Sequence, residues 1–273
     1  MHFIVVGQWQ GSASSRAMRL GDGAAAIAAD LPRASTTVVE VPPGAGDRLE
    51  TAIARYTSVR QVAERVAEES SVAPEAPFVV GGDGSSFLGA TVGLDEDTAF
   101  VRIAGSSGYR PLNRAQPVAA EAAALRLVVD RPDDLFPDLP VLSGSKVVLA
   151  GVRGAEDSEL TALERAGIRT LDVDAATAEA VASAVSATGA GSVFVHVDLD
   201  VLDPAEVDGL LEPVPFGLDG AGLVELLQAA TRGRRLVGAA LTGFAPVDPD
   251  RAVDDLGVIL RAVGALANAS RTA

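Results

Sequence analysis

Three aspartates and a histidine lie close together near position 200, in the run VHVDLDVLDP at 195–204. Successive side chains of a strand point to opposite faces, so His196, Asp198 and Asp200 could share one face. Two carboxylates on one face of an otherwise apolar strand are costly to bury without a cation or hydrogen-bond donors. Carboxylates suit Mn²⁺ or Mg²⁺, and the imidazole would also suit Zn²⁺ or Fe²⁺. One interpretation of this run is therefore a metal site.

The same residues also have an interpretation without metal. Asp198 and Asp200 could pair with arginines or cap the following turn, and Asp203-Pro204 is typical of a turn. His196 on its own is more typical of a core histidine, or of one that supports a neighbouring ligand, than of a ligand itself. The spacing leaves both interpretations open.

A second polar segment is VVGGDGSSFLGA at 79–90, an apolar run followed by two glycines, Asp83 and two serines. Asp83 or Ser85 could cap a following helix, and the glycines allow close approach of the backbone. An anion-binding turn is the alternative. The glycine spacing matches neither of the common phosphate-binding motifs, so a structural turn is favoured, with Asp83 as a candidate pocket residue.

These segments belong to a regular alternation of short apolar runs and longer Ala- and Leu-rich stretches. Strands are expected at 2–7, 36–41, 78–82, 99–105, 146–152, 168–173, 193–200 and 235–244. Helices are expected at 16–31, 49–70, 85–94, 115–129, 156–166, 175–188, 219–231 and 251–269. This alternation predicts one domain over 1–273, a three-layer α/β/α structure around a mostly parallel eight-stranded sheet. A lid over a pocket is expected in 105–145, the least regular stretch.

Composition narrows the classes of function. The chain has 273 residues, a formal charge of −15 and no cysteine, which excludes disulfides and thiolate metal sites. The acidic balance disfavours nucleic acid and anionic membranes, and it is compatible with a cationic ligand. No apolar run approaches the ~20 residues of a spanning helix, and no charged-then-apolar signal segment opens the chain, so a cytoplasmic protein is expected.

Several motifs in order along the chain resemble one known family. GGDG at 81–84 is similar to the GGDH motif of ureohydrolases, and DLDVLDP at 198–204 is similar to their DxDxxDP motif. The segments at 147–168, with Arg153, and at 212–227 resemble the family's intervening and following regions. Residues 9–27 resemble the opening of an actinobacterial arginase-like subgroup. The chain is thereby identified as a member of the ureohydrolase (arginase/agmatinase/formiminoglutamase) superfamily, which implies the arginase-like fold.

The resemblance also implies a chemistry and a set of ligands. Active members hydrolyse C–N bonds of linear amidines and guanidines with two Mn²⁺ ions that activate a bridging hydroxide. Of six ligand positions this chain keeps Asp198 and Asp200. The alignment predicts that the other four positions are lost, at Gly84, Ile103, Gly105 and Ser107.

Other functional positions of the family also differ here. The proton-shuttle histidine has no counterpart, with Gln116 nearest to it, and Thr242 or Ala245 stands near the late-strand acidic residue. The chain has two histidines in all, His2 and His196, so a histidine-rich binuclear site cannot be built under any alignment.

We therefore expect a protein that has lost the manganese pair and guanidino hydrolysis, a pseudoenzyme or a ligand-binding or regulatory subunit. Its pocket candidates are Asp83, His196, Asp198 and Asp200, with no metal or a single weakly bound divalent ion. Without metal, one aspartate could be protonated, or Arg102 or Arg153 could act as an internal cation. The alternative is a divergent ureohydrolase that uses one metal or none.

The resemblance also suggests the partners of the chain. A small cationic guanidino-type ligand is expected, together with a homo-oligomer (trimer or hexamer) or a hetero-assembly with an active paralogue. Neither nucleic acid nor a membrane is expected as a partner.

Overall fold

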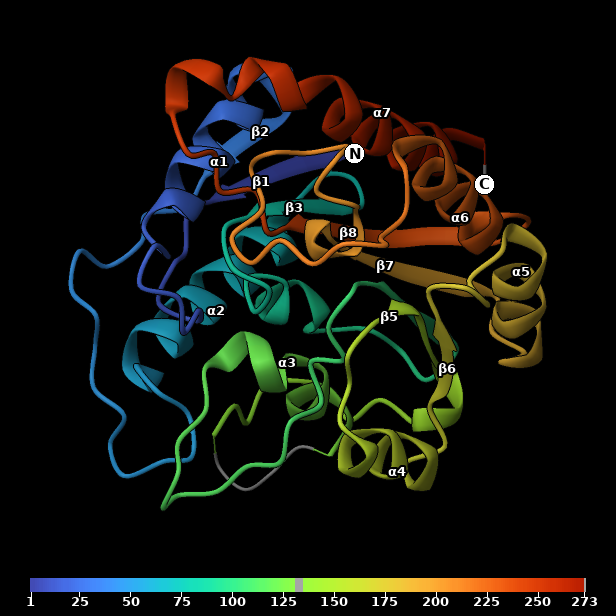
Figure 1. Cartoon of the computed structure of the whole chain (residues 1–273), viewed down its shortest axis with the longest axis horizontal. Coiled ribbons are helices and arrows are strands. Elements are labelled where there is room, and N and C mark those ends of the chain that lie inside the picture. Colours follow the sequence, from blue (N-terminus) through green and yellow to red (C-terminus); the bar gives the residue numbers. More distant parts are fainter. Residues whose placement is uncertain (131–134, 273) are drawn as a thin grey trace.

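The computed structural model describes residues 1–130 and 135–272. In these residues eight strands form one sheet in the order β2-β1-β3-β8-β7-β4-β5-β6, and every neighbouring pair is parallel (Figure 1). The strands are β1 (His2–Val6), β2 (Thr36–Val38), β3 (Pro77–Gly81), β4 (Thr98–Ile103), β5 (Val147–Val152), β6 (Arg169–Asp172), β7 (Ser192–Asp198) and β8 (Arg235–Thr242). The predicted sheet is confirmed, and it is entirely rather than mostly parallel.

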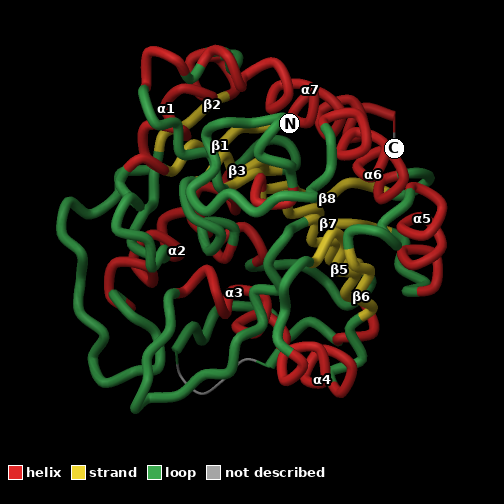
Figure 2. The backbone as a smooth tube through the Cα atoms, viewed as in Figure 1, coloured by secondary structure: helices red, strands yellow, loops and turns green. Residues whose placement is uncertain are grey.

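Helices cover both faces of the sheet, which Figure 2 shows as two groups on either side of the strands. One face carries α1 (Arg19–Ala29), α5 (Ala178–Ala187), α6 (Gly220–Thr231) and α7 (Val253–Thr272). The other face carries α2 (Tyr56–Val72), α3 (Ala120–Val129) and α4 (Asp157–Arg165). Strands buried on both faces must be apolar on both faces, which explains their continuous apolar sequences. None of the helices in the described part of the chain has the length and apolar character that crossing a bilayer requires.

Two helix predictions differ most from the structure, and the helix expected from residue 115 begins at Ala120. The helix expected at 85–94 is instead a turn with a short 3-10 helix, Leu88–Thr91. The backbone of this segment lies directly against the backbone of α2, since a Cβ atom at Gly89 would lie 2.1 Å from the carbonyl oxygen of Ala63. The helix expected from residue 49 begins at Tyr56 because Arg55 has the left-handed φ of 55°, which interrupts helical geometry.

The parallel sheet decides where a site can form. All carboxyl ends of its strands lie at one edge, so the loops after β1, β3, β4, β5, β7 and β8 converge there. The retained aspartates lie at this edge: Asp198 is the last residue of β7, and Asp200 lies in the 3-10 helix that follows.

Candidate functional site

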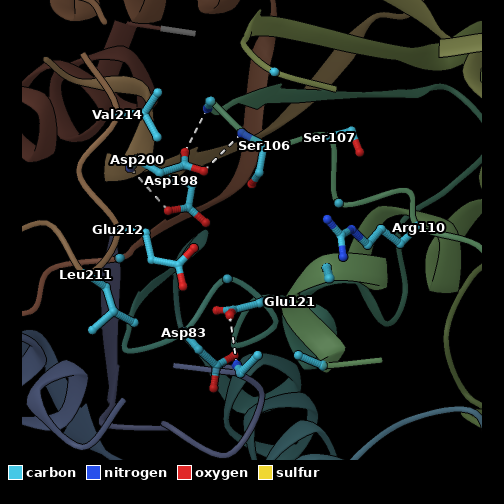
Figure 3. A pocket seen from close by; sticks show the side chains of 18 of the residues that line it. Asp83, Ser106, Ser107, Arg110, Glu121, Asp198, Asp200, Leu211, Glu212 and Val214 are labelled. Carbon is cyan, nitrogen blue, oxygen red and sulfur yellow. Dashed lines mark hydrogen bonds between the residues drawn. The ribbon is translucent and has the colours of Figure 1, made fainter. Parts of the chain in front are cut away.

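A cavity of about 440 Å³ opens at the carboxyl edge of the sheet (Figure 3). Its walls come from the loops after six strands and from the first turn of α3. Its charged lining residues are six carboxylates and two arginines: Asp83, Glu121, Glu159, Asp198, Asp200, Glu212, Arg110 and Arg153. A cavity with this excess of carboxylates favours a cationic ligand.

Asp200 binds backbone amides. Its Oδ1 accepts a hydrogen bond from Gly105 N at 2.7 Å, and its Oδ2 accepts one from Ser106 N at 3.0 Å. Asp200 therefore connects the loop after β4 to the end of β7 through two hydrogen bonds. A Cβ atom at Gly105 would lie 2.6 Å from the carbonyl oxygen of Asp200, so this close junction leaves no room for a side chain there.

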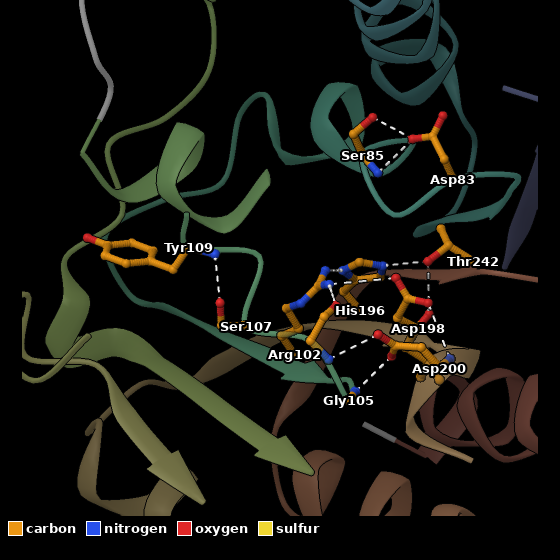
Figure 4. A network of polar contacts seen from close by, with 12 residues as sticks. Asp83, Ser85, Arg102, Gly105, Ser107, Tyr109, His196, Asp198, Asp200 and Thr242 are labelled. Atoms are coloured by element: carbon orange, nitrogen blue, oxygen red, sulfur yellow. Dashed lines mark hydrogen bonds and ion pairs between the residues drawn. The ribbon is translucent and has the colours of Figure 1, made fainter. Parts of the chain in front are cut away.

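Beneath the cavity lies Arg102 of β4, whose side chain is fully buried (Figure 4). Its Nη1 lies 2.7 Å from Nδ1 of His196, and its Nη2 lies 3.6 Å from Oδ2 of Asp198. A guanidinium can only donate, so Nδ1 accepts and the imidazole proton resides on Nε2, 2.9 Å from Oγ1 of Thr242. Burial, followed by the charge of Arg102, holds the pKa of His196 well below its usual value, so the imidazole is neutral.

The internal cation expected among the arginines is thus Arg102. Arg102 pairs with His196 across neighbouring strands, so both side chains point to the face that carries Asp198. Burial, with the nearby charge of Asp200, raises the pKa of Asp198 to about 7, and Arg102 opposes this rise. Arg153 contacts carbonyls instead: its guanidinium donates to the backbone oxygens of Asp200 and Val201.

The four positions predicted as lost ligands have different surroundings. Ile103 does not face the site, because its side chain packs with Val197 in the core on the opposite face of the sheet. The β4 residue that faces Asp198 is its neighbour, Arg102. Ser107 does line the cavity, but its Oγ donates to the carboxylate of Glu159 and accepts from Tyr109 N at 3.0 Å.

Gly84 lies directly against the acidic groups. A Cβ atom there would lie 2.6 Å from Oδ2 of Asp198 and 3.4 Å from Cβ of Glu121. Sequence reasoning missed Glu121, the second residue of α3, because it belongs to no motif and enters the cavity only through tertiary packing. Burial, then the charge of Asp83, raises the pKa of Glu121 to about 8.

Asp83 has an internal role. Its carboxylate accepts hydrogen bonds from the side chain of Gln8 at 2.9 and 3.0 Å and from Gly11 N at 2.8 Å. It also accepts from Ser85 N and Ser85 Oγ at 2.9 and 2.5 Å, so Asp83 caps a turn here and not the helix that the sequence predicts. Burial raises the pKa of Asp83, and these hydrogen bonds oppose the rise.

The family of this chain follows from comparison with known proteins. The arginase family model matches residues 36–258. The chain belongs to the arginase family. A curated relative, the N(omega)-hydroxy-L-arginine amidinohydrolase of Streptomyces lavendulae, is 33% identical over 120 residues, which cover 44% of this chain and 42% of the relative.

Solved arginase-family structures share the fold of this chain. The arginase of Bacillus caldovelox superposes with a TM-score of 0.80 at 18% identity, over 97% of both chains. The Entamoeba histolytica arginase in complex with L-ornithine gives 0.78 at 14% identity, over 97% of both chains. The formimidoylglutamase of Bacillus subtilis gives 0.70 at 17% identity, over 97% of this chain and 86% of that one. The predicted superfamily and arginase-like fold are confirmed.

The resemblance to active arginase-family members implies a manganese pair, and the donors present do not fit one. In residues 1–130 and 135–272, no group of three or more His, Cys, Asp and Glu side chains is arranged to hold a metal ion. His196 faces Arg102 and Thr242, and both oxygens of Asp200 accept from backbone amides. The guanidinium near Asp198 would also repel a divalent cation.

The remaining sequence-predicted positions lie outside the charged lining. Gln116 is exposed in the loop before α3, and Ala245 is buried in a small apolar cluster with Leu20. Thr242 serves the buried network, where its Oγ1 lies 2.9 Å from His196 and 3.4 Å from the carbonyl oxygen of Val197.

Proposed function

We propose that this arginase-family protein binds a small cationic, guanidino-type ligand and does not hydrolyse it through a manganese pair. The observation that carries the proposal is Arg102, a buried guanidinium 2.7 Å from His196 Nδ1 and 3.6 Å from the Asp198 carboxylate. A positive charge built into β4 balances Asp198, which would otherwise call for an external ion.

The chemistry of hydrolysis supports the same conclusion. A water-derived hydroxide at neutral pH requires a metal ion to lower the pKa of the water. At the family's ligand positions this chain has Gly84, which has no side chain, and Ser107, whose hydroxyl binds Glu159. Asp200 is present, but both of its carboxylate oxygens accept from backbone amides. The excess of carboxylates around the cavity still suits recognition of an organic cation.

Two measurements test this proposal together. Protein prepared with excess Mn²⁺ and then desalted should hold well under one ion per chain by elemental analysis. Calorimetry should detect binding of methylguanidinium, agmatine or arginine, and Asp198→Asn should weaken it. Two stoichiometric manganese ions, or no binding by any of the three compounds, would contradict the proposal.

One observation favours a second function, a divergent ureohydrolase that uses one metal or none. Burial raises the pKa of Asp198 to about 7 in a cavity wall, and a carboxyl group with such a pKa is suited to act as a general base near neutral pH. This function predicts release of urea or ammonia from a panel of guanidino compounds. Asp198→Asn should abolish the release, whereas Asp174→Asn on the exposed surface should retain it. A panel without product rules this function out.

A further inference from the structure

One carboxylate in the cavity has no counterpart in the motifs that identify the family. Glu121 projects from the first turn of α3, and Figure 3 shows it pointing into the cavity from the side opposite Asp198 and Asp200. The loop after β1 holds it in place, because Ala13 N donates a hydrogen bond to its Oε1 at 3.2 Å. Glu121 N also donates to the carbonyl oxygen of Gly11. The loop after β1 thus binds both the carboxylate and the backbone of Glu121.

Glu121 and Asp198 flank the same glycine. The Cβ position of Gly84 is 2.6 Å from Oδ2 of Asp198 and 3.4 Å from Cβ of Glu121, so a methyl group there would displace Asp198 and contact Glu121. With glycine there, the floor between the two acidic groups is bare backbone. A flat cation could approach both carboxylates over it.

The two carboxylates differ in whether a positively charged side chain lies beside them. Asp198 has Arg102 at 3.6 Å. Within the described residues no arginine or lysine forms an ion pair with Glu121, whose charged neighbours are Asp83 and Asp198. A buried carboxylate among other carboxylates is stabilised by a cation placed between them. Glu121 thus has no side-chain cation of its own, and a cation bound beside it would favour the ionised form of its carboxyl group.

We infer that Glu121 is the residue that selects the ligand's charge, and that the cationic group of the ligand lies over Gly84 between Glu121 and Asp198. This inference rests on the proposed ligand-binding function and names the residues that perform it. The group that fits is a planar monocation such as a guanidinium or amidinium, whose N–H donors can bind a carboxylate on either side.

The test compares a charged probe with a neutral one of nearly the same shape. Calorimetric titrations use methylguanidinium and methylurea on the full chain. The wild type should bind methylguanidinium and discriminate strongly against methylurea. Glu121→Gln should weaken methylguanidinium binding about tenfold or more, because it removes a charged hydrogen bond, and should shrink the discrimination between the two probes. Gly84→Ala should weaken the binding similarly by displacing the carboxylate of Asp198.

The chain offers a matched control. Glu179 is the second residue of α5, as Glu121 is of α3, and it is exposed and does not line the cavity. Glu179→Gln removes the same charge from the same helical position and should leave binding of both probes unchanged. If Glu121→Gln does not fold, Glu121→Asp keeps the charge but withdraws it by one methylene, and it should also weaken methylguanidinium binding.

Failure of this inference is distinguishable from failure of the proposed function. Wild-type protein that binds methylguanidinium while Glu121→Gln binds it equally well overturns the role of Glu121 and leaves ligand binding intact. Equal losses in Glu121→Gln and Glu179→Gln overturn it as well. Wild-type protein that binds no guanidino compound overturns both.

Discussion

Arg102 carries a positive charge in the interior of a sheet protein, where an isolated ion would be unstable. Its guanidinium contacts the unprotonated Nδ1 of His196, the carboxylate of Asp198 and, at 3.4 Å, the hydroxyl of Ser106. Its Nε has no hydrogen-bond partner among the described residues. The arrangement is therefore sensitive to the loss of any one member.

We predict that Arg102→Ala lowers the free energy of unfolding by about 3–5 kcal/mol, because it leaves Asp198 buried without its cation. The control is Arg60→Ala, which removes an exposed pair with Glu64 on α2 and should cost only about 0.3–0.5 kcal/mol. Urea denaturation of the two variants measures both values. Similar losses would show that Arg102 is not a buried charge partner.

The carboxyl groups of the cavity predict how stability depends on pH. Burial raises the pKa of Asp198 to about 7 and of Glu121 to about 8, above the values these groups have in an unfolded chain. Above about pH 4 the folded state then binds more protons than the unfolded state, so the free energy of unfolding falls as pH rises, until about pH 8. Each proton contributes a slope of at most about 1.4 kcal/mol per pH unit.

His196 acts in the opposite direction, but only at lower pH. Its pKa is well below 6.5 in the folded state, so its contribution rises with pH and is complete once the unfolded imidazole has lost its proton. Denaturation curves between about pH 7.5 and 9, above the titration of an unfolded imidazole, therefore isolate the carboxyl groups. Glu121→Gln should flatten the decline in this range, and an unchanged slope in that variant would contradict the raised pKa of Glu121.

At the scale of elements, Asp83 joins the loops that follow β1 and β3. Asp83→Ala would leave buried donors from Gln8, Gly11 and Ser85 without their acceptor, at about 1–3 kcal/mol for each unsatisfied group. We predict faster amide hydrogen exchange in 8–15 and 83–86, with α5 unchanged as the internal reference. Uniform acceleration over the whole chain would instead indicate global destabilisation.

Elements and site were not equally predictable from the sequence. The strands were found because each is an apolar run that local residues define, and the aspartates at the end of β7 were found because their motif is contiguous. The 3-10 turn at Leu88–Thr91 was missed because its conformation depends on contact with α2, not on its own residues. Glu121 was missed for the same reason. The family alignment places a lost ligand position at Ile103, but its neighbour Arg102 is the residue that faces Asp198. Only the register between β4 and β7 shows this.

At the scale of the whole molecule, the arginase family suggests self-association, and we predict a trimer or hexamer in solution. Large apolar side chains are exposed on the described surface, among them Phe216 at 83% and Val253 at 68%. Light scattering coupled to size exclusion should give three or six times 27.7 kDa. A mass of one chain at micromolar concentration would contradict this prediction.

The buried guanidinium of Arg102 has a consequence for how the protein depends on its surroundings. A metal ion is acquired after synthesis, competes with other ions and can be removed by a chelator, whereas a side chain of β4 is present in every copy as soon as the sheet has formed. We expect ligand binding by this protein to be indifferent to chelators and to the supply of manganese.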